Sequence, residues 1–236
     1  PQLLVCAPLH AWLLRAAPAT ATAQRLPAEA AGSGFAELLR GAQFRRIGLF
    51  VLLMMMITSA LPAHLVSLLR EARMPESWAI AVPASIGAFQ VLGRLLLYFF
   101  EHHFDLHHAD RLIPALLPLG LAALLALLWG GGTQPLLAWL FVLLFGLGNG
   151  MLTIVRGTVI AQYVSQRHAV GLNGALGLPQ ALARAAAPLL LGALWSERLG
   201  YRLGLALLCA AGGLALLALV QAQRRVRPDD AAERAP

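Results

Sequence analysis

Six long apolar segments dominate the chain and restrict its fold more than any other feature. They lie at 46–69, 78–100, 112–129, 135–163, 170–194 and 201–222. Each is long enough for a helix to cross a hydrocarbon core of about 30 Å. Because every backbone N–H and C=O needs a partner inside a bilayer, such segments span it as helices. Joined by short connections, they predict an all-α integral membrane protein with a bundle of six transmembrane helices over residues 46–222.

The composition agrees with this class. The chain is 59% hydrophobic and 12% charged, whereas soluble domains have roughly 25% charged residues. All 18 basic residues are arginine and the net charge is +7. The arginines lie mainly in short loops and tails, without interleaved aromatic residues, so nucleic acid is not an expected partner. We expect the two cysteines, Cys6 and Cys209, to be small buried hydrophobic residues.

Three further stretches flank the bundle. Residues 1–15 are apolar but too short to cross a bilayer, and we interpret them as the end of a preceding transmembrane helix. Residues 16–45 are mostly small and polar, with several prolines and glycines, which predicts a flexible cytoplasmic connection. Residues 223–236 are polar and contain proline, which predicts a disordered cytoplasmic tail.

The distribution of arginine predicts the orientation, because cytoplasmic loops carry the excess of basic residues. If the 16–45 connection lies inside, eleven arginines fall on the cytoplasmic side and four outside. The outer four are Arg70, Arg73, Arg198 and Arg202. We therefore expect both the early connection and the C-terminus to be cytoplasmic.

Three arginines lie inside apolar segments, and no Asp or Glu occurs between Asp110 and Glu197. A bare charge in hydrocarbon costs about 2.5–3.5 kcal/mol on insertion scales, so such groups face a cavity or a partner. Arg184 lies near the predicted bilayer centre, Arg94 in the cytoplasmic half, and Arg156 near the inner boundary, where it can reach the interface. The guanidinium fork suits a carboxylate or phosphate. Backbone carbonyls as partners, or an interfacial anchor at Arg156, remain alternatives.

Three other polar residues extend this candidate binding set. Gln90 stands one turn before Arg94 on the same helical face and offers an amide beside the charge. His64 follows Pro62 in the first segment and could relay protons near neutral pH, with a structural histidine as the alternative. Asn149, within GLGNG, could hydrogen-bond either a ligand or a neighbouring helix.

Small residues cluster in the fourth and fifth segments. Gly146 and Gly150 match the GxxxG spacing that lets helices approach closely. Gly171, Gly174 and Gly177 follow in the next segment. These glycines serve packing alone, or they let helices slide during a transport cycle.

The connection EHHFDLHHAD contains four histidines. His103 and His107, at helical spacing, could chelate zinc or nickel, and a solvated loop over 102–108 is the alternative. The chain has no Gly-rich phosphate loop, no Ser–His–Asp arrangement and no paired intramembrane carboxylates. We therefore expect no enzyme activity, no catalytic residues, no resident metal and no cofactor.

Three runs resemble the C-terminal half of a major facilitator superfamily transporter, in particular bacterial permeases related to monocarboxylate transporters. They are IGAFQVLGRLLL, FGLGNGMLTIVRGTVI and GLNGALGLPQALARAAAPLL, in the second, fourth and fifth segments. The resemblance covers about residues 1–222. It implies that residues 1–15 end span six, that 16–45 joins two halves, and that an N-terminal six-helix half is missing from this chain.

The resemblance also implies a bacterial inner-membrane protein that works by alternating access around a midplane site. The cavity would be lined by the segments that carry His64, Gln90, Arg94, Asn149, Arg156 and Arg184. In monocarboxylate carriers an arginine at the place of Arg94 is thought to meet the substrate carboxylate, with an aspartate one turn earlier. Here Gln90 replaces that acid, which leaves proton coupling at this position in question.

The leading hypothesis is thus a secondary transporter of a small organic solute, such as a monocarboxylate or another organic anion. One alternative is a drug or metabolite exporter of the same fold, in which the arginines serve packing. The other is a non-transporting membrane scaffold or sensor.

Overall fold

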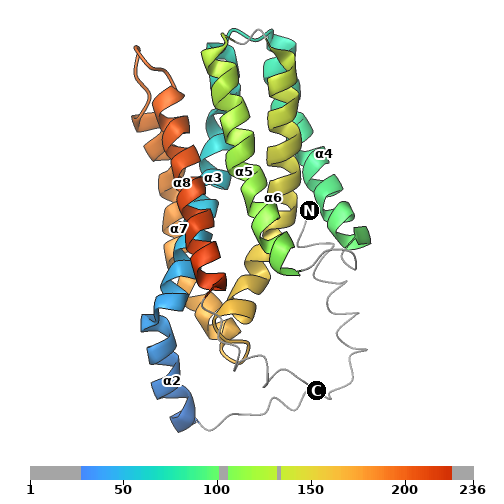
Figure 1. The fold of residues 1–236 in the computed structure, drawn as a ribbon. Coiled ribbons are helices and arrows are strands. Elements are labelled where there is room, and N and C mark those ends of the chain that lie inside the picture. Colours follow the sequence, from blue (N-terminus) through green and yellow to red (C-terminus); the bar gives the residue numbers. More distant parts are fainter. Residues whose placement is uncertain (1–27, 101–105, 132–133, 225–236) are drawn as a thin grey trace, which may run out of the picture. The chain divides into compact units, whose positions relative to one another are not determined.

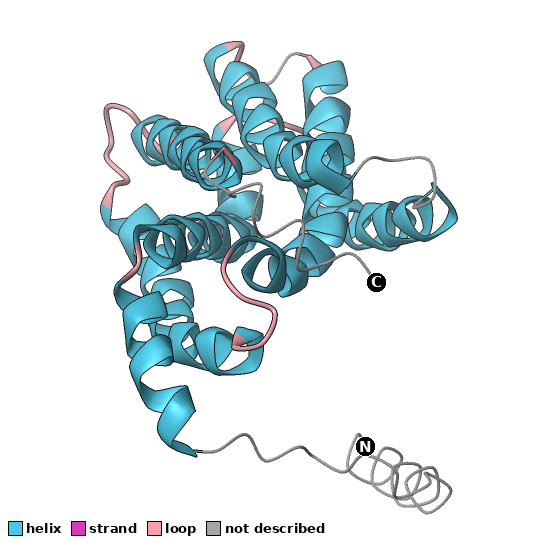
Figure 2. Ribbon diagram, turned by 60° about the horizontal axis from the view of Figure 1, so that its bottom comes forward, coloured by secondary structure: helices cyan, strands magenta, loops and turns pink. Residues whose placement is uncertain are grey.

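The computed structural model describes residues 28–100, 106–131 and 134–224. The chain divides into two compact units, residues 1–36 and 37–236. The described part of the first unit is the start of helix α2 (Ala28–Arg40). The regular elements of the second unit are helices (Figure 1, Figure 2). After the end of α2 they are α3 (Ala42–Glu71), α4 (Glu76–Phe100), α5 (Leu106–Trp129), α6 (Pro135–Tyr163), α7 (Ala169–Ala193) and α8 (Arg202–Gln223).

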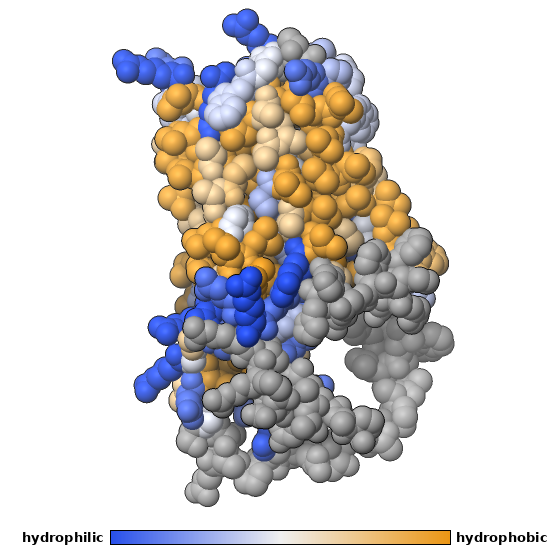
Figure 3. Space-filling model, in the orientation of Figure 1, coloured by the Kyte–Doolittle hydropathy of each residue, from blue (hydrophilic) through white to orange (hydrophobic). Residues whose placement is uncertain are grey.

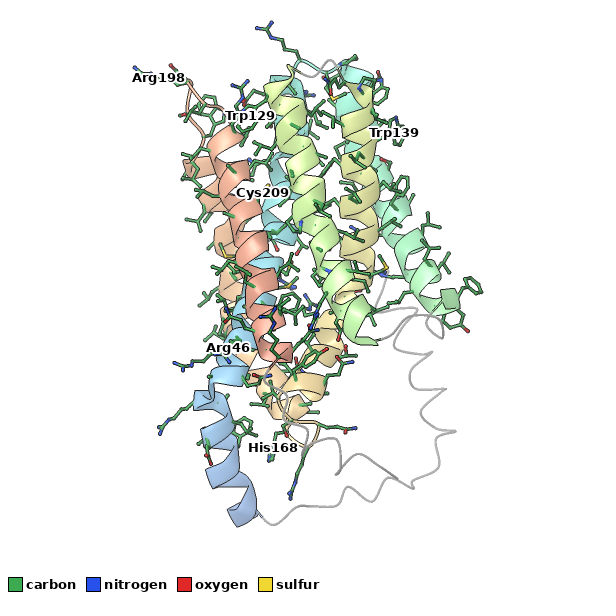
Figure 4. The ribbon with its side chains drawn as sticks, viewed as in Figure 1. Arg46, Trp129, Trp139, His168, Arg198 and Cys209 are labelled. Carbon is green, nitrogen blue, oxygen red and sulfur yellow. The ribbon has the colours of Figure 1, made fainter. Side chains whose placement is uncertain are left out.

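Each predicted apolar segment is one helix, so the all-α prediction is confirmed. All six helices from α3 to α8 are long and apolar enough to cross a membrane. Apolar side chains cover the middle of the bundle, and hydrophilic ones gather toward its two ends (Figure 3). Arg198, Trp129 and Trp139 lie toward one end, whereas Arg46 and His168 lie toward the other (Figure 4).

The second half of the predicted connection is helical, in α2 and the first turn of α3. Alanine, leucine and glutamate outnumber the glycines in AEAAGSGFAELLR, and their helix propensity outweighs about 1 kcal/mol lost at each glycine. Arg40 in the last turn complements the helix dipole. Residues 1–27 and 225–236 lie outside the described residues, and the cytoplasmic location of the connection stays a prediction.

The helices do not pack in chain order. The main pairs are α5 with α6, α4 with α6, α3 with α7, α3 with α8, and α5 with α8. Only the first of these joins helices that follow one another in sequence. Short loops therefore fix where a helix begins, but not which neighbour it packs against.

This packing pattern contains an internal repeat of three helices. Exchanging α3 with α6, α4 with α7 and α5 with α8 maps the main pairs onto one another, with α5–α8 mapped onto itself. The equivalent helices have similar lengths, 30 and 29 residues, 25 and 25, and 24 and 22. Because α3 and α6 run in opposite directions (Figure 1), the repeat is inverted.

Glycine brings the backbones of α4 and α6 together, as the small-residue pattern predicts. A Cβ on Gly93 of α4 would lie 2.7 Å from the carbonyl oxygen of Leu147, and one on Gly150 of α6 would clash with the backbone of Gln90. In α7, by contrast, a Cβ on Gly174 or Gly177 would meet nothing within 4 Å. A packing role is therefore confirmed for Gly146, Gly148 and Gly150 of α6, whereas these two in α7 face open space.

Candidate functional site

Arg94 lies on α4 beside the glycine contact with α6. Its Nε donates a hydrogen bond to the carbonyl oxygen of Gly150, 3.4 Å away, while the rest of the side chain is exposed. Gln90, one turn earlier, is half-buried, and its backbone packs on Gly150. The predicted neighbourhood of Gln90 and Arg94 thus lies at the α4–α6 contact, where a backbone carbonyl is the protein partner of the arginine.

Arg156 and Arg184 come together from different helices. Arg156 on α6 is half-buried and donates from Nη1 to the thioether sulfur of Met55 on α3. Arg184 on α7 is exposed. The two guanidinium groups are close enough to repel one another. Their positive charges therefore act on one region, which α3, α6 and α7 border.

None of the three intramembrane arginines has an ion-pair partner among the described carboxylates. Among the described residues, Arg70 and Glu76 form an ion pair between exposed side chains at the α3–α4 connection. Arg156 has a thioether, a weak acceptor, for a group with five N–H donors. Most of the N–H donors of Arg156 and Arg184 thus have no acceptor among the described residues.

A polar face of α6 leads to Arg156. Asn149, Thr153 and Arg156 are spaced by four and three residues, so they share one side of the helix. Asn149 and Arg156 are half-buried, and Thr153 is exposed and donates to the carbonyl oxygen of Gly150 at 2.8 Å. Among the described residues, Asn149 has no hydrogen-bond partner. This face runs about 10 Å along the helix, at about 1.5 Å per residue.

His64 lies away from these arginines, between α3, α7 and the start of α8. Its Nε2 lies 2.9 Å from the carbonyl oxygen of Pro188 and its Nδ1 lies 3.1 Å from the hydroxyl of Tyr201. A carbonyl can only accept, so Nε2 carries the proton and Nδ1 of the neutral ring accepts from Tyr201. Gly192 leaves room for the ring, 3.3 Å from where its Cβ would be. Both nitrogens therefore have protein partners, as the structural alternative requires.

Gln180 belongs to the candidate site but is absent from the predicted set. It lies one turn before Arg184 on α7, is half-buried and has no described hydrogen-bond partner. Its signal is present in the sequence, because QALAR at 180–184 repeats the Gln-x-x-x-Arg spacing of QVLGR at 90–94. Since α4 and α7 are equivalent in the internal repeat, each carries an amide one turn from an arginine.

A polar network at the Arg198 end of the bundle also goes beyond the sequence predictions. Glu71, at the end of α3, accepts hydrogen bonds from the indole nitrogen of Trp195 at 3.1 Å and from the backbone N–H of Tyr201 at 3.2 Å. Tyr201 then reaches His64 with its hydroxyl. The network ties the α7–α8 connection to α3.

A second network joins three helices at the opposite end. Asp110 of α5 is 3% exposed and accepts a hydrogen bond from the hydroxyl of Tyr163 of α6 at 2.7 Å. That hydroxyl accepts from Gln223 of α8 at 3.1 Å, and Arg111 donates to the same glutamine side chain. Asp110, which stands just before the stretch without carboxylates, is thus engaged in contacts between helices.

The His-rich stretch lies outside the described side chains, so the pairing of His103 with His107 stays untested. Among the residues whose side chains are described, no group of three His, Cys, Asp or Glu could hold a metal. Cys209 is half-buried in α8.

Comparison with known proteins gives no assignment. No family model matches the chain, and no curated protein or solved structure matches it.

Proposed function

We propose that this chain is the C-terminal half of a secondary transporter of the major facilitator type. It moves a small organic anion, such as a monocarboxylate, by alternating access, and it is not an enzyme. The protein resides in the bacterial inner membrane with its C-terminus in the cytoplasm, where the arginine bias puts it.

The inverted repeat of α3–α5 and α6–α8 is the observation that carries this proposal. Inverted repeats of transmembrane helices are the architecture of many secondary transporters, with the substrate site near the midplane. The positively charged region at Arg156 and Arg184 supplies a reason for an anion, because no described carboxylate neutralises it.

Exposure of α4 and α7 supports a missing partner half. In each, 17% of the most apolar 18-residue window is buried, against 50% in α5 and α6. The exposed face of α7 is rich in glycine and alanine, which suit helix packing in membranes better than lipid contact. A second six-helix half would cover these two helices and close the region that holds the arginines.

Uptake by the intact protein in proteoliposomes tests the proposal. Labelled lactate and pyruvate, with a wider panel of organic anions, are compared for the wild type, Arg94→Ala and Arg184→Ala. Loss of a charge-assisted hydrogen bond costs about 1.5–3 kcal/mol, so KM for a transported anion should rise about 10- to 150-fold.

Arg167→Ala is the matched control, because Arg167 is exposed in the α6–α7 connection, outside the site. Its uptake should equal that of the wild type. If Arg94→Ala and Arg184→Ala leave the uptake of every anion unchanged, the anion role is wrong. If the wild type carries no solute of any charge, the transport function is wrong.

A further inference from the structure

The charge of a ligand can be argued from the charges of the described site, because opposite charges neutralise one another. The helices α3, α4, α6 and α7 contribute Arg94, Arg156 and Arg184, and their interiors contain no Asp or Glu. The first of these is held at the α4–α6 contact by Gly150, whereas the other two face one common region. This region therefore holds two positive charges with no described negative charge beside them.

Helix register supports this convergence. On α3, Gly48 packs against Leu176 of α7, and His64 meets Pro188 of the same helix. Interpolation between these two contacts places Arg184 about level with residues 58–59 of α3, roughly one turn from Met55 at 1.5 Å per residue. Met55 is the residue that Arg156 contacts. Arg184 is thus carried by α7 at a level within about one turn, roughly 5 Å along the helix axis, of the residue that Arg156 contacts.

Neutral hydrogen-bonding groups surround the pair. Gln180 lies one turn from Arg184, and Thr153 and Asn149 precede Arg156 on the same face of α6. The amides of Gln180 and Asn149 can donate to an anion and add no negative charge of their own, whereas the hydroxyl of Thr153 already donates to Gly150. A singly charged ligand would leave one guanidinium uncompensated, whereas a doubly charged ligand neutralises both.

We propose that Arg156 and Arg184 together bind a small organic solute that carries two negative charges, with Gln180 donating to it. This inference rests on the transport function proposed above and names its substrate class. A dicarboxylate and a phosphate monoester both present this charge, and both offer the oxygen pairs that a guanidinium fork binds.

Binding by thermal shift tests the charge requirement without relying on transport. Purified intact protein is unfolded with succinate or succinamate, which differ by one carboxylate, and with glycerol 3-phosphate or glycerate, at constant ionic strength. A ligand that binds the folded state raises the unfolding midpoint, by an amount that grows with the logarithm of its concentration divided by Kd. We expect at least one dianion to bind about tenfold or more tightly than its singly charged partner.

Variants connect this preference to the two arginines. Arg156→Gln and Arg184→Gln should each reduce the preference for the dianion to about twofold or less, because each leaves one positive charge. Arg167→Gln removes a positive charge elsewhere and should retain the full preference. A response to succinate alone identifies a dicarboxylate, and a response to glycerol 3-phosphate alone identifies a phosphate ester.

Two outcomes overturn the inference. One is that neither dianion shifts the midpoint more than its singly charged partner. The other is that both glutamine variants retain the preference of the wild type. In either case uptake of a monocarboxylate by the intact protein would leave the proposed transport function standing, so the two failures are distinguishable.

Discussion

Two adjacent glycines in α8 provide a sharp test of the helix packing. A Cβ on Gly212 would lie 2.8 Å from Cβ of Pro118 in α5, whereas a Cβ on Gly213 would meet nothing within 4 Å. The proline ring cannot rotate away, so α8 must move by about 0.6 Å before ordinary contact at 3.4 Å is restored. A separation of that size forfeits roughly a quarter of the dispersion energy of each affected contact, and about half when the gap is nearer 1 Å.

The pair isolates the cost of overpacking. Gly→Ala gains about 0.8–1 kcal/mol of helix propensity at either position, since both lie inside the same helix. Overpacking at Gly212→Ala costs about 1–3 kcal/mol. The free energies of unfolding of the two variants should therefore differ by about 1–3 kcal/mol, with Gly213→Ala the more stable.

Thermal unfolding of the purified protein in one detergent measures this difference. At roughly 2–4 °C per kcal/mol for a chain of this size, the two midpoints should lie about 2–12 °C apart. Equal midpoints, or a lower midpoint for Gly213→Ala, would show that α8 does not pack on α5 as described and would refute the reasoning.

Three further predictions concern the polar networks and the orientation. Tyr201→Phe leaves Nδ1 of His64 without its donor and should destabilise the protein by about 1–3 kcal/mol in thermal unfolding; an unchanged midpoint would contradict the hydrogen bond. Asp110→Ala removes the acceptor of the Tyr163 hydroxyl and should cost a similar amount, about 1–3 kcal/mol, whereas Asp110→Asn keeps an acceptor and should cost less; equal losses would argue against this role. Arg198→Cys, with the native cysteines replaced by serine, should react with a membrane-impermeant maleimide on intact cells; labelling only after permeabilisation would reverse the orientation.

The helices were predictable from the sequence because length and hydropathy determine them almost alone. The predicted segment 135–163 coincides with α6, and 170–194 differs from α7 by one residue at each end. The largest difference is at α5, which begins at Leu106 rather than at 112. There the helix continues into polar residues, where hydropathy no longer marks its end.

The site was less predictable, because sequence gives the depth of a residue but not the helix that lies opposite. Arg156 contacts Met55, 101 positions away, and shares its region with Arg184 only because α3 packs between α6 and α7. The partners of His64 are equally distant in sequence, at Pro188 and Tyr201. The repeated QVLGR and QALAR runs could have identified Gln180, since their equal spacing reflects the internal repeat.

The glycine contact between α4 and α6 has a mechanical consequence. No side chain lies between the two backbones at Gly93 and Gly150 to absorb a displacement, so a force on one helix passes directly to the other. Arg94, which bridges them, should therefore keep a constant distance to Arg156 in every conformation. Arg184 is carried by α7, which packs mainly on α3. Its distances to Arg94 and to Arg156 are therefore free to change. Spin labels on α4, α6 and α7 should then show a constant distance between α4 and α6 and, if the chain transports a solute as proposed, a changing distance from α7 to each of them.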